Sequence, residues 1–377
     1  MSPVPNVARM ADRVEVRSVE SRADNSAFIG LPYRLYRHDS TWVAPLRLAE
    51  RQRWSARRNS SLETRWFRRF IARRGRRVVG RVAAVVDPEF ASRWRANAGF
   101  FGFFETEDDP EVAAALFAAA EAALRTQGAG HVLGPVNLST QDEVGLLIDG
   151  FDRSPTLLSP YNPPWYRRHV EAAGYGACRD YHAYLWTPDL PAPPADTAAW
   201  PAGLVLRTAD PRRWVEEVRM LHGLYNAAFA GVWGYVPITW DEFRERAESF
   251  KPFYRPELVV VAEQGGVPAG FGLVLPDVNT ALAGLGGRLL PFGWLRLMFR
   301  VPRIRSVRFI LLGVDPAHTG HGIARRIASR MIEEGRKAGV REGDLSLVLE
   351  GNVRMRRVIE ALGCPRIRTF RLYEKAL

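Results

Sequence analysis

Lysine is nearly absent from this chain of 377 residues. Only Lys251, Lys337 and Lys375 occur, although lysine and arginine together number 53, and the formal net charge is +12 at pH 7. Arginine therefore carries most of the positive charge. Two interpretations are open: arginines solvated on exposed faces, or attraction to an anionic partner such as a phosphorylated cofactor, an acidic lipid surface or nucleic acid. The sequence lacks helix-turn-helix, zinc-finger and RNA-binding signatures, which argues against a nucleic-acid partner.

Cysteine and long apolar runs are equally scarce. Cys178 and Cys364 are too few for a disulfide framework or a cysteine-based zinc site, and we expect no metal. No stretch approaches the roughly 18 uninterrupted apolar residues of a membrane-spanning helix. Residues 1–20 contain no apolar core of a signal peptide. With 47% hydrophobic and 25% charged residues, the composition is typical of a water-soluble globular protein. We therefore expect a cytoplasmic location.

The sequence is long enough for two domains, and its halves resemble each other. Residues 187–203 are rich in proline and alanine and predict a linker. The halves on either side share a strand–turn–strand pattern at 70–87 and 260–277. At an offset of 190, this pattern repeats Ala72, Gly75, Gly80 and Asp87 as Ala262, Gly265, Gly270 and Asp277. We therefore predict domains at 14–186 and 204–377.

The ends of the halves also match, 166–186 with 355–375, at an offset of 189. Each end reads as a short helix stopped by a glycine and followed by a strand. In the second half a strand at 306–314 precedes a long helix at 322–339; the first half repeats this plan at 99–107 and 110–128. Hairpins combined with strand–helix–strand units predict an α/β (α+β) fold, in which a mixed sheet carries helices on both faces.

A glycine-containing loop, VDPAHTGHGIARR, occupies residues 314–326. Gly320 and Gly322 permit positive φ and a close approach of a ligand to the main chain. The helix that begins near Gly322 adds free N–H groups and the positive end of its dipole. Together these features suit a pyrophosphate. The loop is not a Walker loop, because no Gly-Lys-Ser/Thr follows, and it lacks the three-glycine spacing of a Rossmann fingerprint.

With its surroundings, this loop resembles the GNAT superfamily of acyl-CoA N-acyltransferases. The resemblance rests on LLGVDPAHTGHGIARRIASRMIEEGRKAG, LSLVLEGNVRMRRVIEALGC and the terminal FRLYEKAL; it covers 204–377 well and 14–186 more faintly. It implies two tandem GNAT-like domains, with acyl-CoA or acetyl-CoA bound by the second as co-substrate. The implied pyrophosphate loop comprises Thr319, Gly320, His321, Gly322, Ile323 and Ala324.

The sequence departs from the family at two positions. Thr319 stands where the family carries Arg or Gln, so that contact is missing or is supplied by Arg325 or Arg326. Ile359 stands where a Tyr commonly protonates the departing thiolate. Because Ile359 has no proton to donate, the acid is another group, water, or unnecessary; such a group typically contributes roughly 10²–10⁴-fold.

The chemistry that the resemblance implies is direct attack of an amine on a thioester carbonyl. Backbone N–H groups near Gly313 and Val314 would polarise this carbonyl. Glu350 is the first candidate for the base, although it equally suits an exposed carboxylate that caps the next helix; His318 and His321 are further candidates. Asn352 matches the family's Asn at the start of that helix and completes the predicted catalytic set.

The first half lacks an equivalent loop, because FFETEDDPEVAAAL passes from strand to helix through acids that would repel a pyrophosphate. We interpret this half as a degenerate copy that shapes the substrate side. Aromatic and amide side chains on long connections suggest a pocket, with packed loops as the alternative. The candidates for substrate contact are Tyr161 and Asn162 in the first half and Tyr225, Asn226, Trp233 and Tyr235 in the second.

Residues 288–305 interleave arginines with large apolar side chains. Such a stretch can lie peripherally on the inner face of an anionic membrane, line an acyl tunnel, or simply pack between the two halves. Together with the tandem plan, it resembles the large GNAT-like proteins that act as bacterial ceramide synthases, which join a long acyl chain to a sphingoid amine. The alternatives are an acetyltransferase that acts on small molecules or proteins, and a non-catalytic protein that binds acyl-CoA or serves as a scaffold.

Overall fold

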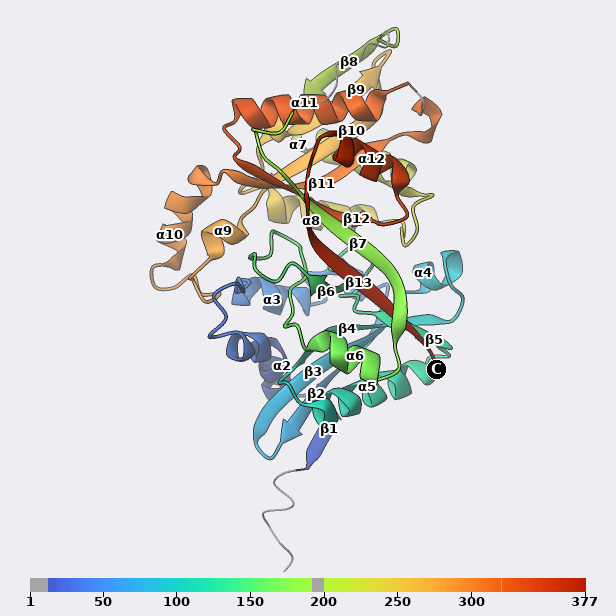
Figure 1. The fold of residues 1–377 in the computed structure, drawn as a ribbon, viewed down its shortest axis with the longest axis vertical. Coiled ribbons are helices and arrows are strands. Elements are labelled where there is room, and N and C mark those ends of the chain that lie inside the picture. Colours follow the sequence, from blue (N-terminus) through green and yellow to red (C-terminus); the bar gives the residue numbers. More distant parts are fainter. Residues whose placement is uncertain (1–12, 192–199, 320) are drawn as a thin grey trace, which may run out of the picture. The chain divides into compact units, whose positions relative to one another are not determined.

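The computed structural model describes residues 13–191, 200–319 and 321–377, and the chain forms two compact units (Figure 1). The first unit runs to Ser154 and also contains 160–180 and 370–377. The second contains 155–159 and 181–369. Positions 192–199 of the predicted linker and the predicted loop residue Gly320 lie outside the described residues. The mixed, mostly antiparallel sheet with helices confirms the predicted fold class.

The first unit contains the strand order β1-β2-β3-β4-β5-β13. Its strands are β1 Val14–Ser18, β2 Trp66–Arg74, β3 Arg77–Val86, β4 Ala98–Thr106, β5 His131–Gly134 and β6 Leu146–Asp149, which pairs with β13 Arg366–Ala376. Its helices are α2 Arg22–Leu35, α3 Arg47–Arg53, α4 Pro88–Arg93, α5 Pro110–Arg125 and α6 Tyr166–Ala172. The pair β4–β5 is parallel, whereas β1–β2, β2–β3, β3–β4 and β5–β13 are antiparallel.

The second unit contains the order β7-β12-β11-β10-β9-β8, in which β11–β12 is the parallel pair. Its strands are β7 Gly176–Trp186, β8 Leu204–Thr208, β9 Val259–Gln264, β10 Val267–Pro276, β11 Ser306–Val314 and β12 Glu342–Leu349. Its helices are α7 Trp214–Phe229, α8 Trp240–Phe250, α9 Asn279–Leu282, α10 Gly293–Arg300, α11 Ile323–Lys337 and α12 Val353–Ala361.

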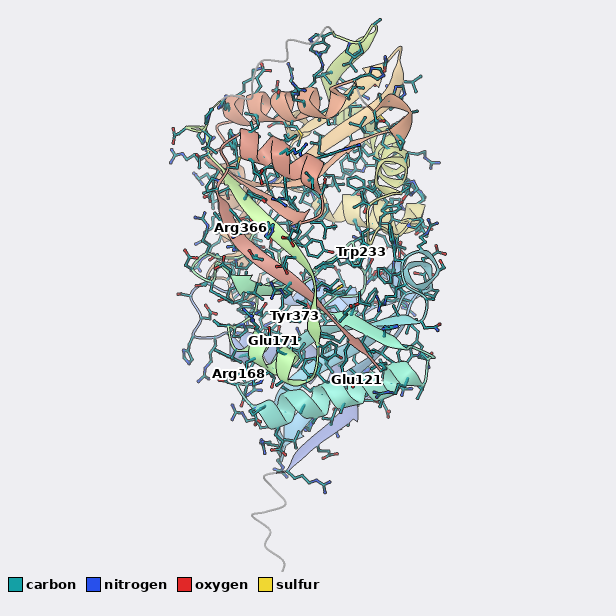
Figure 2. The ribbon with its side chains drawn as sticks, turned by 45° about the vertical axis from the view of Figure 1, so that its right-hand side comes forward. Glu121, Arg168, Glu171, Trp233, Arg366 and Tyr373 are labelled. Atoms are coloured by element: carbon teal, nitrogen blue, oxygen red, sulfur yellow. The ribbon has the colours of Figure 1, made fainter. Side chains whose placement is uncertain are left out.

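The closing strand of each half completes the sheet of the other half. Trp186 of β7 pairs with Gly343 of β12 in the second unit, and Tyr373 of β13 pairs with Gly134 of β5 in the first. The Tyr373 hydroxyl also donates to a Glu171 carboxylate oxygen at 3.2 Å (Figure 2). Cutting the sequence at the linker would assign each half its own last strand. The repeat makes both segments suitable strands, and strand pairing decides which unit each one completes.

Helices cover both faces of the second sheet because side chains alternate along β10. A Cβ on Gly272 would lie 2.1 Å from the Met331 sulfur of α11, so a glycine there permits close packing of that helix. The neighbouring Phe271 points to the other face and packs with Leu221 and Leu224 of α7. Burial of each such apolar side chain contributes about 1.5–3 kcal/mol. These contacts hold α11 and α7 on opposite faces of β10.

A buried polar cluster ties residues 155–159 into the second unit. Asp277 accepts a hydrogen bond from the Leu157 amide at 2.8 Å, and Asp344 accepts one from the Thr156 hydroxyl at 2.9 Å. Arg308 of β11 donates to the Leu157 carbonyl and, at 3.3 Å, to the Ser346 carbonyl of β12. Burial raises the pKa of Asp277 to about 6, although hydrogen bonds from backbone amides oppose this rise.

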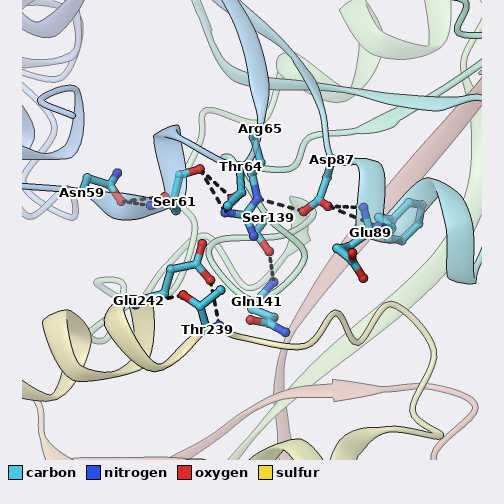
Figure 3. Close-up of polar contacts among 11 residues, drawn as sticks. Asn59, Ser61, Thr64, Arg65, Asp87, Glu89, Ser139, Gln141, Thr239 and Glu242 are labelled. Carbon is cyan, nitrogen blue, oxygen red and sulfur yellow. Dashed lines mark hydrogen bonds and ion pairs between the residues drawn. The ribbon is translucent and has the colours of Figure 1, made fainter.

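Asp87, the repeat counterpart of Asp277, has a different partner. Its carboxylate pairs with Arg65 at 2.8 Å, and both side chains are buried (Figure 3). The same carboxylate accepts from the amides of Glu89 and Phe90 at 3.0 and 3.1 Å and so caps α4. Both aspartates accept from the amide two residues along the chain, while the buried partner changes from a guanidinium to the 155–159 main chain.

Asp277→Asn is expected to change the pH dependence of stability. Between the ordinary carboxyl pKa of 3.8 and the raised value of about 6, folded wild type retains a proton that unfolded chains release. Raising the pH through this window therefore lowers the free energy of unfolding, by up to about 3 kcal/mol for two pKa units. Asn cannot titrate, so the variant should gain stability relative to wild type from pH 4 to 7 in urea titrations. The control is Asp315→Asn, which removes the carboxylate that caps the 3₁₀ turn Pro316–His318. A stability difference between Asp277→Asn and wild type that stays constant from pH 4 to 7 would contradict the prediction.

Candidate functional site

The parallel strands β11 and β12 separate along their length. They pair from Ser306 and Glu342 to Phe309 and Leu345, and the ladder ends there. In the pairing of β11 with β10, a register shift leaves Ile310 as an extra residue between Phe309 and Leu311. Such a bulge bends its strand and increases the local twist. An opening therefore forms between the two central strands of the second unit.

A cavity of 160 Å³ occupies this opening. Its lining comes from both separated strands, from α11 and α12, and from single residues of β7 and α7: Trp186, Phe229, Phe309–Leu312, Ala328, Met331, Ile332, Leu345–Val348, Asn352, Met355, Val358, Ile359 and Leu362. Most of these side chains are hydrocarbon or thioether. The Ser346 hydroxyl and the Trp186 indole N–H have no hydrogen-bond partner among the described residues, although both atoms are buried. The cavity suits an alkyl chain that carries a few polar groups.

Helix α11, which follows β11 through the predicted glycine loop, begins without a side-chain cap. Gly322 is the N-cap residue and has a φ of 71°, in the left-handed region that favours glycine. The first turn contains no acidic residue, and no side-chain cap hydrogen bond occurs. Upstream, the Thr319 hydroxyl donates to the Pro316 carbonyl at 2.9 Å, and His318 Nδ1 lies 3.0 Å from Gln264. Among the described residues no side chain therefore caps the first N–H groups of α11, an arrangement that suits an anionic ligand.

The corresponding helix of the first unit is capped. Asp109 at the start of α5 accepts hydrogen bonds from the Glu111 and Val112 amides at 3.0 and 3.2 Å. Arg74 holds the same carboxylate at 2.9 Å. Burial opposes ionisation, but the hydrogen bonds from Arg74 and these amides lower the pKa of Asp109 below its ordinary value. The Asp109 carboxylate therefore caps the start of α5, whereas no side chain caps the corresponding start of α11.

The gap between the parallel strands of the first unit is also filled. The β4–β5 ladder ends at Phe100 and Leu133, and the Val136 amide then donates to the Phe101 carbonyl at 2.9 Å. A Cβ on Gly102 would lie 2.1 Å from the Val136 carbonyl oxygen. Asn137 completes the closure, because its side-chain oxygen accepts from the Phe103 amide at 2.7 Å. The chain thus packs into the gap whose counterpart in the second unit is a cavity.

Known proteins are similar to this chain in sequence. A family model described as "Acetyltransferase (GNAT) family" matches residues 221–364. Over 372 residues the chain is 34% identical to Protein YghO of Escherichia coli (strain K12), covering 96% of this chain and 95% of that protein. Over 375 residues it is 36% identical to the bacterial ceramide synthase of Caulobacter vibrioides, covering 97% and 98%. The chain belongs to the GNAT family.

Solved structures match both halves of this GNAT protein together. A tandem GNAT protein from the clavulanic acid biosynthesis pathway aligns over 97% of this chain and 98% of its own, with a TM-score of 0.56 and 15% identity. A GCN5-related N-acetyltransferase from Sphaerobacter thermophilus aligns over 97% and 96%, with a TM-score of 0.54 and 16% identity. At such identities the likeness concerns the fold, and it confirms the predicted tandem GNAT architecture. Members of this family transfer acyl groups from acyl-CoA to amines.

The predicted catalytic residues of this GNAT protein lie at different depths. Asn352 lines the cavity, and its side-chain oxygen accepts from the Met355 amide at 3.2 Å as the N-cap of α12. Glu350 is exposed on the turn after β12, and its carbonyl accepts from Arg356 at 3.1 Å. Ile359 is only 1% exposed and lines the cavity, so an apolar side chain occupies the position where the family commonly has a Tyr.

The predicted cofactor residues divide between the loop and β11. His321, Ala324 and Arg325 are exposed near the start of α11, whereas Ile323 is buried against the core. Gly313 and Val314 are paired with Phe271 and Gly270 of β10 in the register of the sheet. The β11 residues that line the cavity are 309–312, which precede the predicted pair in the same strand.

Three of the predicted acceptor-side residues of the second unit, Tyr225, Asn226 and Tyr235, contact one another. The Asn226 side-chain oxygen accepts from the Tyr235 hydroxyl and, at 3.2 Å, from the Ile238 amide, so this amide group holds 235–238 against α7. The Tyr225 ring lies 5.1 Å from that of Phe229, which lines the cavity. Trp233 is half-buried. After this segment, Thr239 and Glu242 form a capping box at the start of α8 (Figure 3).

Tyr161 and Asn162 belong to the first unit, so the unit that holds the cavity does not include them. The Tyr161 hydroxyl donates to Asp39 at 2.6 Å. Asn162 is buried and bonds both the amide and the carbonyl of Leu147, at 2.7 and 3.1 Å. These contacts order the long connection between β6 and α6.

Sequence reasoning missed most of the cavity lining. The usable signal was the pair of short apolar runs FILL at 309–312 and LVL at 347–349, which lie on the two central parallel strands. Among the described residues no group of three or more His, Cys, Asp and Glu side chains is arranged to hold a metal ion. Within the same residues, no helix has both the length and the hydropathy that a membrane crossing requires.

Proposed function

We propose that this GNAT protein transfers a long acyl chain from a CoA thioester to a long-chain, sphingoid-type amine. One observation carries the proposal: the uncapped start of α11 adjoins an apolar cavity between separated β11 and β12, whereas the first unit closes both features with its own residues. Among the described residues, this pairing of an uncapped helix start with an open gap between parallel strands occurs in the second unit, so we place one cofactor site there. The first unit then helps to shape the substrate side.

In this proposal the CoA pyrophosphate lies on the N–H groups of Gly322, Ile323 and Ala324, which the helix dipole favours. Thr319, Gly320 and His321 complete the loop. The exposed Arg325 of the first turn supplies a cation where the family commonly uses Arg or Gln at position 319. The pantetheine arm enters the cavity, where the buried Ser346 hydroxyl and Trp186 N–H can bond its amide groups.

The reaction forms a bond between the amine nitrogen and the thioester carbonyl carbon, and the carbon–sulfur bond then breaks. The amine proton goes to a base, and the CoA thiolate leaves and takes a proton from solvent. Backbone N–H groups beside the bulge at Ile310 are better placed than those of Gly313 and Val314 to stabilise the oxyanion, because the cavity is lined by 309–312. Ile359 confines the acyl chain and supplies no proton.

Glu350 is retained as the proposed base, and Glu350→Gln tests it. Loss of a general base should lower kcat/KM by roughly 10²–10⁴-fold and should remove the acidic limb of its pH profile. Glu360→Gln, on the exposed face of α12, is the matched control and should leave both unchanged. If Glu350→Gln behaves like the control, Glu350 is an exposed turn residue and water takes the proton.

Three features support a lipid amine as the acceptor. The cavity lining is almost wholly apolar, and the aromatic side chains around Tyr225 continue it through Phe229. The relative from Caulobacter vibrioides that is 36% identical over nearly its full length is named a ceramide synthase. The amphipathic stretch 288–305 adds apolar surface to the same unit.

The decisive experiment measures thiol release from acetyl-, octanoyl- and palmitoyl-CoA with a sphingoid base, a short alkylamine and a lysine peptide as acceptors. The proposal predicts that only palmitoyl-CoA with the sphingoid base gives rapid release, with the amide product visible by mass spectrometry. A preference for acetyl-CoA would reject the lipid substrate and favour an acetyltransferase. CoA binding without release from any pair would favour a non-catalytic acyl-CoA-binding protein.

A further inference from the structure

Residues 288–305 place an unusual set of side chains at the surface of the second unit. Five large apolar side chains are exposed there, Leu290 by 78%, Phe292 by 67%, Trp294 by 50%, Met298 by 55% and Phe299 by 54%. Single exposed apolar residues are ordinary, but contiguous groups mark interaction sites. This group of exposed apolar side chains is therefore a candidate interaction surface.

The segment is ordered by contacts that leave those side chains outside. A Cβ on Gly293 would lie 2.2 Å from the Arg288 carbonyl oxygen, so the chain folds tightly onto the start of α10. Arg300 at the end of the helix donates to the carbonyls of Ala281 and Ala283 at 3.2 and 2.8 Å. Among helices and strands, α10 contacts mainly α9 and the 3₁₀ turn Val301–Arg303 (Figure 1). The apolar side chains thus project from an ordered segment that includes α10, and they do not pack into the core.

Several arginines surround this apolar cluster. No Asp or Glu occurs between Asp277 and Asp315 in the sequence. An open hollow of 590 Å³ beside the cluster is lined by Phe299, Arg300, Arg303, Arg305, Arg341 and Glu342, among other residues. The bonds of Arg303 and Arg305 are to backbone carbonyls, at 2.6 Å to Phe299 and 3.2 Å to Ala338. Arg300 likewise bonds the backbone carbonyls of Ala281 and Ala283.

We propose that residues 288–305, together with Arg341, form a docking surface for an anionic phospholipid bilayer. The exposed Phe292, Trp294 and Met298 enter the boundary between headgroups and acyl chains, where aromatic rings are favoured. The guanidinium groups around the hollow bind lipid phosphates, for which Arg offers paired donors. Interleaved apolar and cationic side chains with no acid between them match a bilayer surface, which presents hydrocarbon and phosphate side by side. The vesicle-binding test of this inference does not depend on which substrate the acyltransferase uses.

Sedimentation of the full chain with vesicles tests the proposal. The protein should bind vesicles in which about a third of the lipid is phosphatidylglycerol, should bind phosphatidylcholine vesicles much more weakly, and should dissociate at high salt. The double variants Phe292→Ser/Trp294→Ser and Arg303→Glu/Arg341→Glu should each weaken binding at least about tenfold. Both alter exposed side chains, and retained CoA binding with an unchanged melting temperature will establish that each variant is folded.

Matched controls separate this surface from overall charge and overall apolarity. Arg57→Glu/Arg76→Glu makes the same change in net charge at exposed positions of the first unit. Val205→Ser/Val267→Ser removes side chains that are 56% and 57% exposed elsewhere on the second unit. Both controls should bind like wild type. The proposal is overturned if the protein does not sediment with anionic vesicles, if it binds both vesicle types equally, or if the controls weaken binding as much as the test variants.

Discussion

Gly322→Asp is expected to weaken CoA binding about 1000-fold. The substitution places a carboxylate at the start of α11, as Asp109 does at the start of α5. At about 4 Å near a protein surface, one pair of like charges costs about 4 kcal/mol, which corresponds to that loss of affinity. Isothermal titration of CoA into the purified protein measures the change directly.

Gly322→Asn isolates the electrostatic part of this effect. Asn has the same shape as Asp and tolerates positive φ about as well, so its loss of affinity should stay within about tenfold. Gly266→Asp controls for strain and charge away from the loop, because Gly266 lies at a turn of the second unit with a φ of 81° and open space where a Cβ would lie. Equal losses for the Asp and Asn variants at position 322 would show that the start of α11 does not hold the pyrophosphate.

Ala328→Phe is expected to reduce acyl transfer more than 100-fold while CoA still binds. Ala328 lines the 160 Å³ cavity from α11, so an aromatic ring there occupies space assigned to the thioester and the acyl chain. Displacing reacting atoms by about 1 Å already costs about 10²-fold in rate. Single-turnover assays with palmitoyl-CoA, run beside CoA titration, separate the two effects.

The control for this variant is Ala114→Phe, which adds the same ring to an exposed position of α5. It should leave transfer and CoA affinity at the wild-type level. Wild-type transfer by Ala328→Phe would mean that the acyl chain does not use this cavity. A large loss of CoA affinity with normal turnover at saturation would place the pyrophosphate, not the acyl chain, next to Ala328.

Much of the secondary structure could be predicted because local rules act within short stretches. The predicted helix at 322–339 and strand at 306–314 correspond to α11 and β11 nearly residue for residue. The alternation of side chains defines the strand, and Gly322 at the helix start supplies a conformation that other residues adopt reluctantly. The tandem GNAT architecture followed from such motifs together with the internal repeat.

The cavity could not be predicted in the same way. Its lining joins residues from Trp186 to Leu362, and it exists because the β11–β12 ladder ends at Phe309 and Leu345. That separation depends on a bulge at Ile310, which no local pattern announces. Asn226 and Asn162, which the sequence predicts as substrate contacts, also bond the main chain of Ile238 and Leu147, and their contact with a substrate stays a prediction.

By itself, the sequence determined the family, the repeat, the pyrophosphate-type loop and the scarcity of lysine and acid around 288–305, since each depends on the identity of neighbouring residues. The sequence also predicted a cofactor loop in the second half and none in the first, but only the tertiary structure showed how the first half closes its own gap and helix start. Asp109 caps α5 and Val136 fills the first gap, while Gly322 leaves α11 uncapped and Ile310 bends β11 away from β12. Strand pairing also decided that the last strand completes the first unit. These outcomes depend on contacts between residues distant in sequence, whose free energies no local pattern contains.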